Sequence, residues 1–185
     1  MSLRRSKIEA IHLCAVGEAS SPGLFSDLAR NLESIFGVPC VIWENSLPVD
    51  SAFDVNRGQY HSTAILRILE PLAIGATEVR LLGVTCLDLF VPVLTFVFGE
   101  AQLEGRCAVV SLYRLREEFY GLPASEQLLK ERALKEAVHE LGHTFGLRHC
   151  SDWRCVMAST HAVERLDLKS INFCPSCQKA IWRDI

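Results

Sequence analysis

The 185-residue chain lacks an excess of basic charge, and it lacks any long apolar run. Lys and Arg number 19 and Asp and Glu number 22, so the formal net charge is −3 at pH 7. Proteins that bind nucleic acid usually concentrate basic charge, and this balance predicts no such partner. No segment approaches the roughly 18 consecutive apolar residues of a membrane-spanning helix. We therefore expect neither nucleic acid nor a membrane among the partners.

The start of the chain lacks the pattern of a secretory signal peptide. It has a basic flank, but Glu9 and His12 interrupt the apolar stretch, and no small-residue cleavage site follows. The sequence therefore predicts a cytoplasmic protein. Stable disulfides are unusual in that reducing compartment, so the eight cysteines of the chain require another explanation.

Internal repeats, low-complexity segments and linkers are also missing, which favours a single domain spanning residues 1–185. With 49% hydrophobic and 22% charged residues, the composition is that of a globular protein and not of a disordered one. The only shift in composition is a cysteine-rich end after residue 149. A second kind of site is therefore expected in that end of the chain.

The most informative segment is HELGHTFGLRH at residues 139–149, which reads H-E-x-x-H-x-x-G-x-x-H. On a helix, His139 and His143 project from one face a single turn apart, so both imidazoles can bind one metal ion. Glu140 lies beside them with a carboxylate that is free for proton transfer. An exposed helix face that carries two histidines is the alternative for the short H-E-x-x-H form, and the additional fixed positions disfavour it.

The second half of this motif predicts a third ligand. His149 is too far along the chain to share the helix face, but Gly146 can adopt a positive φ, end the helix and turn the chain back. Three ligands on a tetrahedral ion leave the fourth position to water, which is typical of a catalytic zinc and not of a structural one. The sequence therefore predicts a catalytic Zn²⁺ bound by His139, His143 and His149.

The cysteines divide into two groups. Four of them lie scattered among apolar residues and are expected to be buried free thiols, namely Cys14, Cys40, Cys86 and Cys107. The other four follow the motif as C-x4-C and C-x2-C, namely Cys150, Cys155, Cys174 and Cys177. Two short-spaced pairs of this kind are the usual arrangement for four thiolates around one structural zinc. Two disulfides are the alternative, which the absence of a signal peptide disfavours.

The two predicted metal sites are joined by one peptide bond, because His149 belongs to the first and Cys150 to the second. Adjacent Cα atoms lie 3.8 Å apart, so with the reach of both side chains the ions are at most about 14 Å from each other. Folding of the cysteine segment therefore fixes where His149 lies. We expect a cysteine substitution to loosen the histidine site as well.

The chain upstream of the motif predicts an α/β scaffold. The expected strands occupy residues 8–16, 38–43, 77–85, 96–104 and 105–115. The expected helices run from Leu24 to a stop at Gly37, from Tyr60 to a stop before Pro71, and from an N-cap at Ser125 to Phe145. This alternation is typical of a mostly parallel sheet. The last two strands would pair antiparallel if the turn falls at Glu104-Gly105.

Beyond these local signals, the sequence resembles a known family. The elongated histidine motif followed by Met157 in CVMAST is similar to that of metzincin zinc peptidases, in which a methionine turn lies beneath the metal. KEAVHELGHTFGLRHC, followed by the remaining cysteines up to FCPSC, resembles the archaemetzincin branch in particular. The likeness covers most of the chain and includes QYHSTAIL, DLFVP, FVFGEAQ and VVSLYRLR.

This resemblance implies a metzincin fold, with a twisted, mostly parallel sheet and one antiparallel edge strand above the cleft. Residues 1–146 would form an upper part with the sheet and the active-site helix. Residues 147–185 would form a lower part with the methionine turn and the four-cysteine zinc site. The edge strand would carry Phe98, Gly99 and Glu100 and pair with an extended peptide substrate.

The resulting hypothesis is a monomeric zinc peptidase with two Zn²⁺ ions per chain, one catalytic and one structural. Glu140 would act as general base on the water at the fourth zinc position, and the family suggests aminopeptidase activity. The alternative is a metzincin scaffold with an unoccupied catalytic site, acting as a peptide-binding or regulatory protein. A nucleic-acid binder that uses the cysteine site is a third class, which the acidic balance disfavours. His161 is expected to be an ordinary surface histidine.

Overall fold

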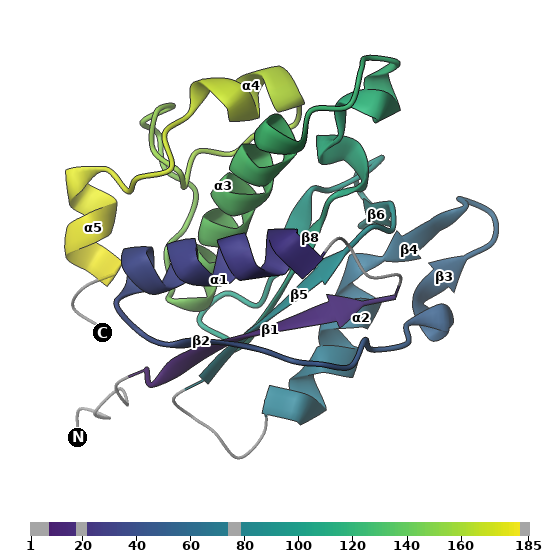
Figure 1. Ribbon diagram of the computed structural model, residues 1–185, viewed down its shortest axis with the longest axis horizontal. Helices are drawn as coiled ribbons and strands as arrows, with labels where there is room; N and C mark the ends of the chain where they lie inside the picture. The colour runs from purple at the N-terminus through teal and green to yellow at the C-terminus, as the bar shows by residue number, and fades with distance from the viewer. Residues whose placement is uncertain (1–7, 18–21, 74–78, 182–185) are drawn as a thin grey trace.

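The structure is a computed structural model that describes residues 8–17, 22–73 and 79–181. Its strands are β1 (Ala10–Val16), β2 (Cys40–Ile42), β3 (Phe53–Asp54), β4 (Gln59–His61), β5 (Val79–Thr85), β6 (Leu89–Phe90), β7 (Gly99–Ala101) and β8 (Cys107–Ser111). Its α-helices are α1 (Pro22–Phe36), α2 (Ser62–Leu69), α3 (Glu126–Thr144), α4 (Val163–Leu168) and α5 (Pro175–Ile181) (Figure 1). Short 3-10 helices are η1 (Asp50–Ala52), η2 (Glu70–Ala73), η3 (Tyr113–Leu115) and η4 (Glu117–Tyr120). None of the described helices combines the length and the apolar character needed to cross a membrane.

The main sheet has five strands in the order β2-β1-β5-β8-β7. β2, β1, β5 and β8 pair in parallel, and β7 pairs antiparallel with β8 at one edge. A second sheet of three short strands has the order β3-β4-β6. The predicted mixed α/β fold with a mostly parallel sheet and an antiparallel edge strand is therefore confirmed.

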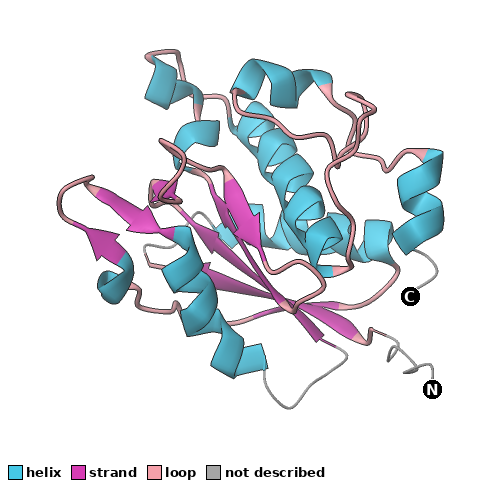
Figure 2. Ribbon diagram, turned by 180° about the vertical axis from the view of Figure 1, so that it is seen from behind, coloured by secondary structure: helices cyan, strands magenta, loops and turns pink. Residues whose placement is uncertain are grey.

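Alternating side chains of the strands fill two separate cores, because successive residues of a strand point to opposite faces. In β8, Ala108 and Val110 join the core beneath α1 and α3, whereas Cys107 and Val109 join the core beneath α2. Figures 1 and 2 show α1 and α3 on one face of the sheet and α2 on the other. All five β8 residues are buried, as expected for a strand of a sheet covered on both faces.

Capping residues set the ends of the two longest helices. The Ser125 side chain accepts a hydrogen bond from the backbone N–H of Leu128 at 3.3 Å, which confirms the predicted N-cap of α3. After α1, Gly37 adopts a φ of 68° and its N–H donates to the Glu33 carbonyl at 2.8 Å. The predicted stop of this helix is therefore also confirmed.

The second predicted helix begins later than expected. Tyr60, predicted to lie in that helix, belongs to β4, where it pairs with Phe53 of β3 and Leu89 of β6. Its ring packs against the Phe53 ring at a centroid distance of 5.0 Å. Pairing between segments that are distant in sequence thus overrides the helical spacing of the local residues. Helix α2 begins at Ser62.

The other differences concern the ends of strands. The predicted strand 105–115 is shorter, because the chain enters η3 after Ser111. Thr77 and Glu78 of the predicted strand 77–85 lie outside the described residues, and β5 is described from Val79 onward. The antiparallel pairing of β7 with β8 is confirmed, with a turn in which the Gly105 N–H donates to the Gln102 carbonyl at 2.9 Å.

The segment after α3 packs against the same core as the sheet. Val156, Met157 and Leu166 are fully buried in the cluster that also contains Leu13 of β1. Described residues of the sheet and of the segment after α3 therefore share one hydrophobic core.

Two ion pairs tie α3 to this later segment. Arg132 donates to both carboxylate oxygens of Asp167 at 2.7 Å. The Lys169 ammonium is buried and lies 3.3 Å from the Glu136 carboxylate and 3.3 Å from the Ala158 carbonyl oxygen. The Lys169–Glu136 pair is buried on both sides and fixes geometry, because separating its charges would leave one of them unsolvated, whereas Asp167 is partly exposed to solvent.

Candidate metal sites and active-site cleft

The three motif histidines converge on one point. His139 and His143 project from α3, and His149 follows on the loop after the helix, with ring-centroid distances of 4.7, 5.3 and 5.0 Å within the set. One nitrogen of each ring lies within 4.8 Å of the others. Gly146 adopts a φ of 90°, and its N–H donates to the His143 carbonyl at 2.9 Å. The expected helix end and return of the chain at Gly146 are therefore present.

Backbone carbonyls orient two of these rings. The Nδ1 atom of His139 lies 2.8 Å from the Val156 carbonyl oxygen, and that of His143 lies 2.7 Å from the Leu147 carbonyl oxygen. A carbonyl oxygen only accepts, so each Nδ1 carries the hydrogen and each Nε2 presents a lone pair to the centre.

This donor set fits a zinc ion. The two Nε2 atoms lie 3.1 Å apart, which is close to the separation of about 3.3 Å for two imidazoles on a tetrahedral zinc with Zn–N bonds of about 2.0 Å. Two lone pairs at this separation repel each other unless a cation lies between them. The three converging nitrogens could therefore hold a zinc ion.

Burial lowers the pKa of all three histidines below the usual 6.5, most strongly for His139. Metal binding requires neutral rings, and a lowered pKa keeps them neutral to lower pH.

We expect the zinc affinity of this site to stay nearly constant from pH 8 to about 6.5. At lower pH it should fall by up to about 1,000-fold per pH unit once all three rings compete for protons. Chelator competition over pH 5–8 measures the zinc affinity as a function of pH. A steep loss of affinity that already occurs above pH 6.5 would contradict the prediction.

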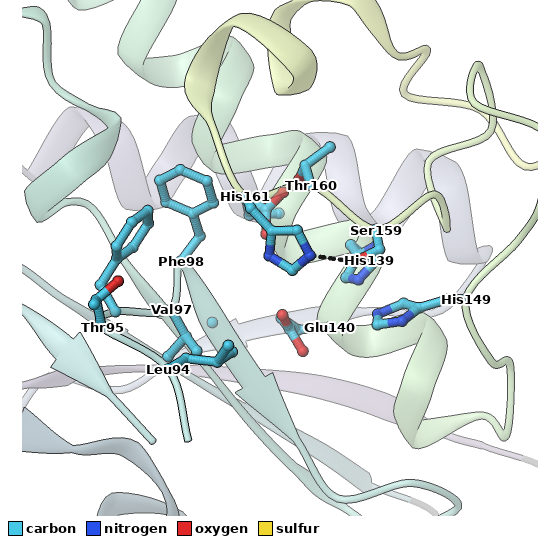
Figure 3. Close-up of a pocket in the computed structure, with 13 residues that line it drawn as sticks. Leu94, Thr95, Val97, Phe98, His139, Glu140, His149, Ser159, Thr160 and His161 are labelled. Carbon is cyan, nitrogen blue, oxygen red and sulfur yellow. Dashed lines mark hydrogen bonds between the residues drawn. The ribbon is translucent and has the colours of Figure 1, made fainter. Parts of the chain in front are cut away.

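Glu140 lies next to the triad, buried with 5% of its surface exposed. Burial raises the pKa of its carboxyl group well above 4.5, Glu136 raises it further, and Lys169 opposes this shift. Figure 3 shows the carboxylate between the edge-strand segment and the His149 ring. A carboxyl group with a raised pKa beside a metal site is suited to accept and release a proton.

Gly99 of β7 forms the opposite wall of the cleft at Glu140. A Cβ atom at this position would lie 2.7 Å from Glu140 Cγ, 2.7 Å from the Val109 carbonyl oxygen and 2.8 Å from Glu140 Oε1. Only glycine therefore lets the edge strand approach the carboxylate this closely.

Met157 is fully buried. A Cβ atom added at Gly142 of α3 would lie 2.5 Å from the Met157 sulfur. The methionine thus packs directly on the helix between His139 and His143, where the methionine turn was expected.

The four late cysteines form a second cluster, with sulfur atoms within 4.8 Å of one another. All eight cysteines are free thiols, so the disulfide alternative has no support in this structure. Hydrogen bonding from the Cys177 backbone N–H lowers the pKa of Cys174 to about 7, whereas burial raises the pKa of Cys155 and of Cys177. Four converging sulfurs without a sulfur–sulfur bond fit a zinc ion, which favours the thiolate form of its ligands.

The four scattered cysteines lie apart from this cluster. Cys14 and Cys107 are buried as predicted, and burial raises the pKa of their thiols to about 12 and about 11. The prediction was wrong for Cys40 and Cys86, which are only partly buried.

One short segment contributes to both clusters. The Val156 carbonyl that orients His139 lies between Cys155 and Met157 in sequence. The Cys150 N–H donates to the Met157 carbonyl at 2.9 Å. A displacement of the cysteines would therefore also move His149 and the Val156 carbonyl that orients His139.

The cleft contains two hollows, one on each side of the triad. One has a volume of about 280 Å³ and is bounded by residues 94–99, by α3 and by residues 159–161 (Figure 3). The other has a volume of about 520 Å³ and is bounded by β7, Leu103, Arg148, His143 and His149. The cleft therefore extends along the edge strand in both directions from Glu140.

The predicted edge-strand residues differ in what they present to this cleft. Phe98 lines the smaller hollow, and Gly99 faces Glu140. The Glu100 carboxylate instead accepts hydrogen bonds from Ser62 Oγ at 2.5 Å and Thr63 Oγ1 at 2.8 Å, at the start of α2. The Glu100 side chain is therefore held at the start of α2, and its backbone lies opposite Val109 of β8.

Three residues of the cleft region were not singled out as site residues by the sequence. His161 is exposed, as predicted, but its ring lies at the mouth of the smaller hollow and contacts Ser159 Oγ at 3.4 Å (Figure 3). Glu136 lies in the wall of that hollow, paired with Lys169. Its position one helical turn before His139 is a usable signal, whereas no local pattern identifies Lys169 as its partner.

Known proteins are similar to this chain in sequence and in fold. The model of peptidase family M54 matches residues 38–183. The archaemetzincin of Methanocaldococcus jannaschii is 43% identical over 154 residues, which is 83% of each chain, and that of Pyrococcus furiosus is 40% identical over 179 residues, with 94% of this chain and 92% of the relative covered. The solved archaemetzincin of Archaeoglobus fulgidus superposes with a TM-score of 0.79 at 36% identity, covering 92% and 99% of the two chains. A zinc-dependent peptidase of Methanocorpusculum labreanum gives a TM-score of 0.83 at 31% identity, with the same coverage.

Family match, sequence identity and fold thus agree with the motif and with the two ligand clusters, and the chain belongs to the archaemetzincins, the zinc metallopeptidases of family M54.

Proposed function

We propose that the chain hydrolyses peptide bonds with zinc bound by His139, His143 and His149 and with Glu140 as general base. The observation that carries this proposal is the placement of a buried carboxylate beside three converging imidazoles in a cleft. A protein that only binds peptides has no need of this carboxylate. When bound, zinc would supply a Lewis acid for the scissile carbonyl and would lower the pKa of water at its open position.

Glu140 moves the proton in this reaction. Its carboxylate takes a proton from the attacking water and then delivers it to the nitrogen of the leaving amine. Because the pKa of Glu140 is raised, its carboxyl group holds the proton more readily between taking it from water and giving it to the amine. Burial also keeps competing bulk water away from the carboxylate.

The substrate is expected to extend the sheet along β7. In an antiparallel ladder, alternate residues direct both backbone groups toward the partner strand. Phe98 accepts from the Ser111 N–H and Gln102 donates to the Cys107 carbonyl, so these residues face β8. Gly99 and Ala101 therefore direct their N–H and C=O groups outward, where an extended peptide can pair with them.

Substitution of Gly99 by alanine tests the fit between this strand and Glu140. The added methyl would push the carboxylate out of place, and a displacement of about 1 Å can cost about 100-fold in rate. We expect kcat/KM on a peptide to fall by about that factor while the zinc content stays unchanged. Leu122→Ala, at an exposed side chain outside both hollows, is the control and should leave kcat/KM unchanged. A fully active Gly99→Ala variant would show that the strand does not position Glu140.

We further propose two zinc ions per chain, with a structural ion bound by Cys150, Cys155, Cys174 and Cys177. Elemental analysis of metal-replete protein, combined with mass-spectrometric cleavage of a random peptide library, tests the whole proposal. Two zinc ions with cleavage support the peptidase. One zinc ion that His143→Ala does not remove, without cleavage, would instead support a peptide-binding or regulatory scaffold.

The same library decides the mode of cleavage. Aminopeptidase activity remains a prediction, and it requires products that are shortened only from their free amino ends. Peptides with acetylated amino ends should then resist hydrolysis. Cleavage of acetylated peptides at internal bonds would contradict the aminopeptidase mode and leave the zinc peptidase proposal intact.

A further inference from the structure

The smaller hollow beside the triad has the size and position of a pocket for one substrate side chain. Its volume of about 280 Å³ lies near the lower end of the range for ligand pockets, about 300 Å³. It adjoins Glu140, His139 and His149, which are the groups at the reacting bond. Figure 3 shows it open between the segment of Leu94 to Phe98 and the segment of Ser159 to His161.

The direction of the substrate decides which side chain enters. This hollow adjoins residues 94–99, before β7, whereas the larger hollow adjoins residues 99–103. The proposed pairing is antiparallel, as it is between β7 and β8, so the peptide runs from the larger hollow toward the smaller one. The smaller hollow therefore receives the residue that follows the scissile bond.

Aromatic rings form one wall of this pocket. Phe96 and Phe98 pack edge to face at a centroid distance of 5.2 Å. The Arg114 guanidinium covers Phe96 at 4.3 Å from the ring centroid, and its bidentate pair with Asp88 holds it there. A fixed pair of rings of this kind packs well against the ring of a substrate side chain.

A buried carboxylate forms another part of the wall. Glu136 is 3% exposed, and within the described residues its only hydrogen-bond partner is Lys169 at 3.3 Å. A carboxylate has about four acceptor sites, so most of its acceptor capacity has no protein donor. The Glu136 oxygens are not among the buried side-chain atoms that lack a partner in the described residues, so the oxygen that Lys169 leaves free is accessible from the hollow and can accept from a donor that enters it.

The charge balance restricts what that donor can be. The Lys169 ammonium, fully buried, already neutralises Glu136, so a lysine or arginine side chain would bring a second positive charge beside it. An acidic side chain would meet Glu136 and Glu140. A neutral hydrogen-bond donor on an aromatic ring can pack its ring against Phe96 and Phe98 and donate its hydrogen to the Glu136 carboxylate.

We infer that this pocket selects tyrosine as the residue after the scissile bond, with Phe96 and Phe98 packing its ring and Glu136 accepting its hydroxyl hydrogen. The inference rests on the proposed function, because it assigns a side chain of the same substrate. It makes Glu136 a specificity-determining residue whose loss changes the ranking of ligands.

Direct binding tests this assignment without any need for turnover. Succinyl hydroxamates anchor on a metal and place one side chain next to it, so a series with 4-hydroxybenzyl, benzyl, isobutyl, 4-aminobutyl and 2-carboxyethyl groups probes the pocket. Calorimetry on the zinc-replete protein should rank 4-hydroxybenzyl first, about tenfold tighter than benzyl, which corresponds to one hydrogen bond to a charged acceptor.

Variants separate the hydrogen bond from the packing. The double variant Glu136→Met with Lys169→Met removes both charges together and keeps an apolar filling, so it should abolish the 4-hydroxybenzyl preference and retain benzyl binding. Phe96→Ala should weaken both aromatic probes by about tenfold and leave their ratio unchanged. Leu72→Ala, an exposed site on η2, is the control and should change neither value.

The outcomes distinguish this inference from the proposed function. Equal affinities for 4-hydroxybenzyl and benzyl, or a preference for 4-aminobutyl, would overturn the selection of tyrosine. The expected ranking in a protein that cleaves no peptide would support the pocket and count against catalysis. Failure of every hydroxamate to bind would overturn the inference together with the histidine metal site.

Discussion

Replacement of Glu140 by glutamine is expected to reduce peptide hydrolysis by about 1,000-fold while both zinc ions remain bound. General acid–base catalysis contributes about 100- to 10,000-fold, and the amide has the shape of the carboxylate but cannot take a proton from water. Glu140 is not among the converging ligand atoms, so its loss should leave metal binding intact. Measurement of kcat/KM on a peptide together with elemental analysis tests both statements.

Protein stability provides the control for this variant. Burial raises the pKa of Glu140, which means that the charged form is disfavoured in the folded state and costs stability above pH 4.5. The neutral glutamine removes this cost, so the thermal unfolding midpoint at pH 7 should be unchanged or higher. A variant that is both inactive and unstable would indicate a structural role, and one that keeps full activity would exclude Glu140 from the mechanism.

Substitution of Cys177 by serine is expected to remove the structural zinc and to weaken zinc binding at the histidine triad at least about tenfold. The cysteine cluster fixes the segment from His149 to Met157, which supplies one ligand and the carbonyl that orients His139. Loss of such an orienting partner typically costs about 10- to 100-fold in metal affinity. Chelator competition with wild-type and variant protein measures the change at the histidine site separately.

The matched control is Cys40→Ser, which alters a partly buried thiol outside the cluster. It should retain two zinc ions and the original affinity of the triad. If Cys177→Ser lost one zinc ion but bound the other with unchanged affinity, the two sites would be independent despite the peptide bond that joins them.

Local sequence spacing was sufficient to predict that the three motif histidines converge. The i, i+4 relation of His139 and His143 holds because α3 is regular there, and the return of His149 follows from the positive φ of Gly146. These features depend on a few neighbouring residues, so a sequence pattern contains them. The N-cap at Ser125 and the hairpin between β7 and β8 were predictable for the same reason.

The features that were missed depend on residues that are distant in sequence. Tyr60 lies in a strand because β3 and β6 flank it, and no local pattern shows these partners. The pairing of Glu136 with Lys169 and the turn of the Glu100 carboxylate toward Ser62 arise only when separate elements pack. Specificity therefore had to be inferred from the assembled cleft, whereas the chemistry could be inferred from the motif.

The open edge of β7 also limits how this protein can associate with copies of itself. An unpaired strand edge is a template for any extended chain, including the edge of a second molecule, and long exposed edges promote aggregation. β7 has only three residues, and β2 at the opposite edge of the sheet is equally short. Such short edges can pair with a brief stretch of peptide but offer little for the growth of a continuous intermolecular sheet. The short length of β7 thus leaves the cleft accessible at a sheet edge that offers few backbone groups to a second copy of the chain.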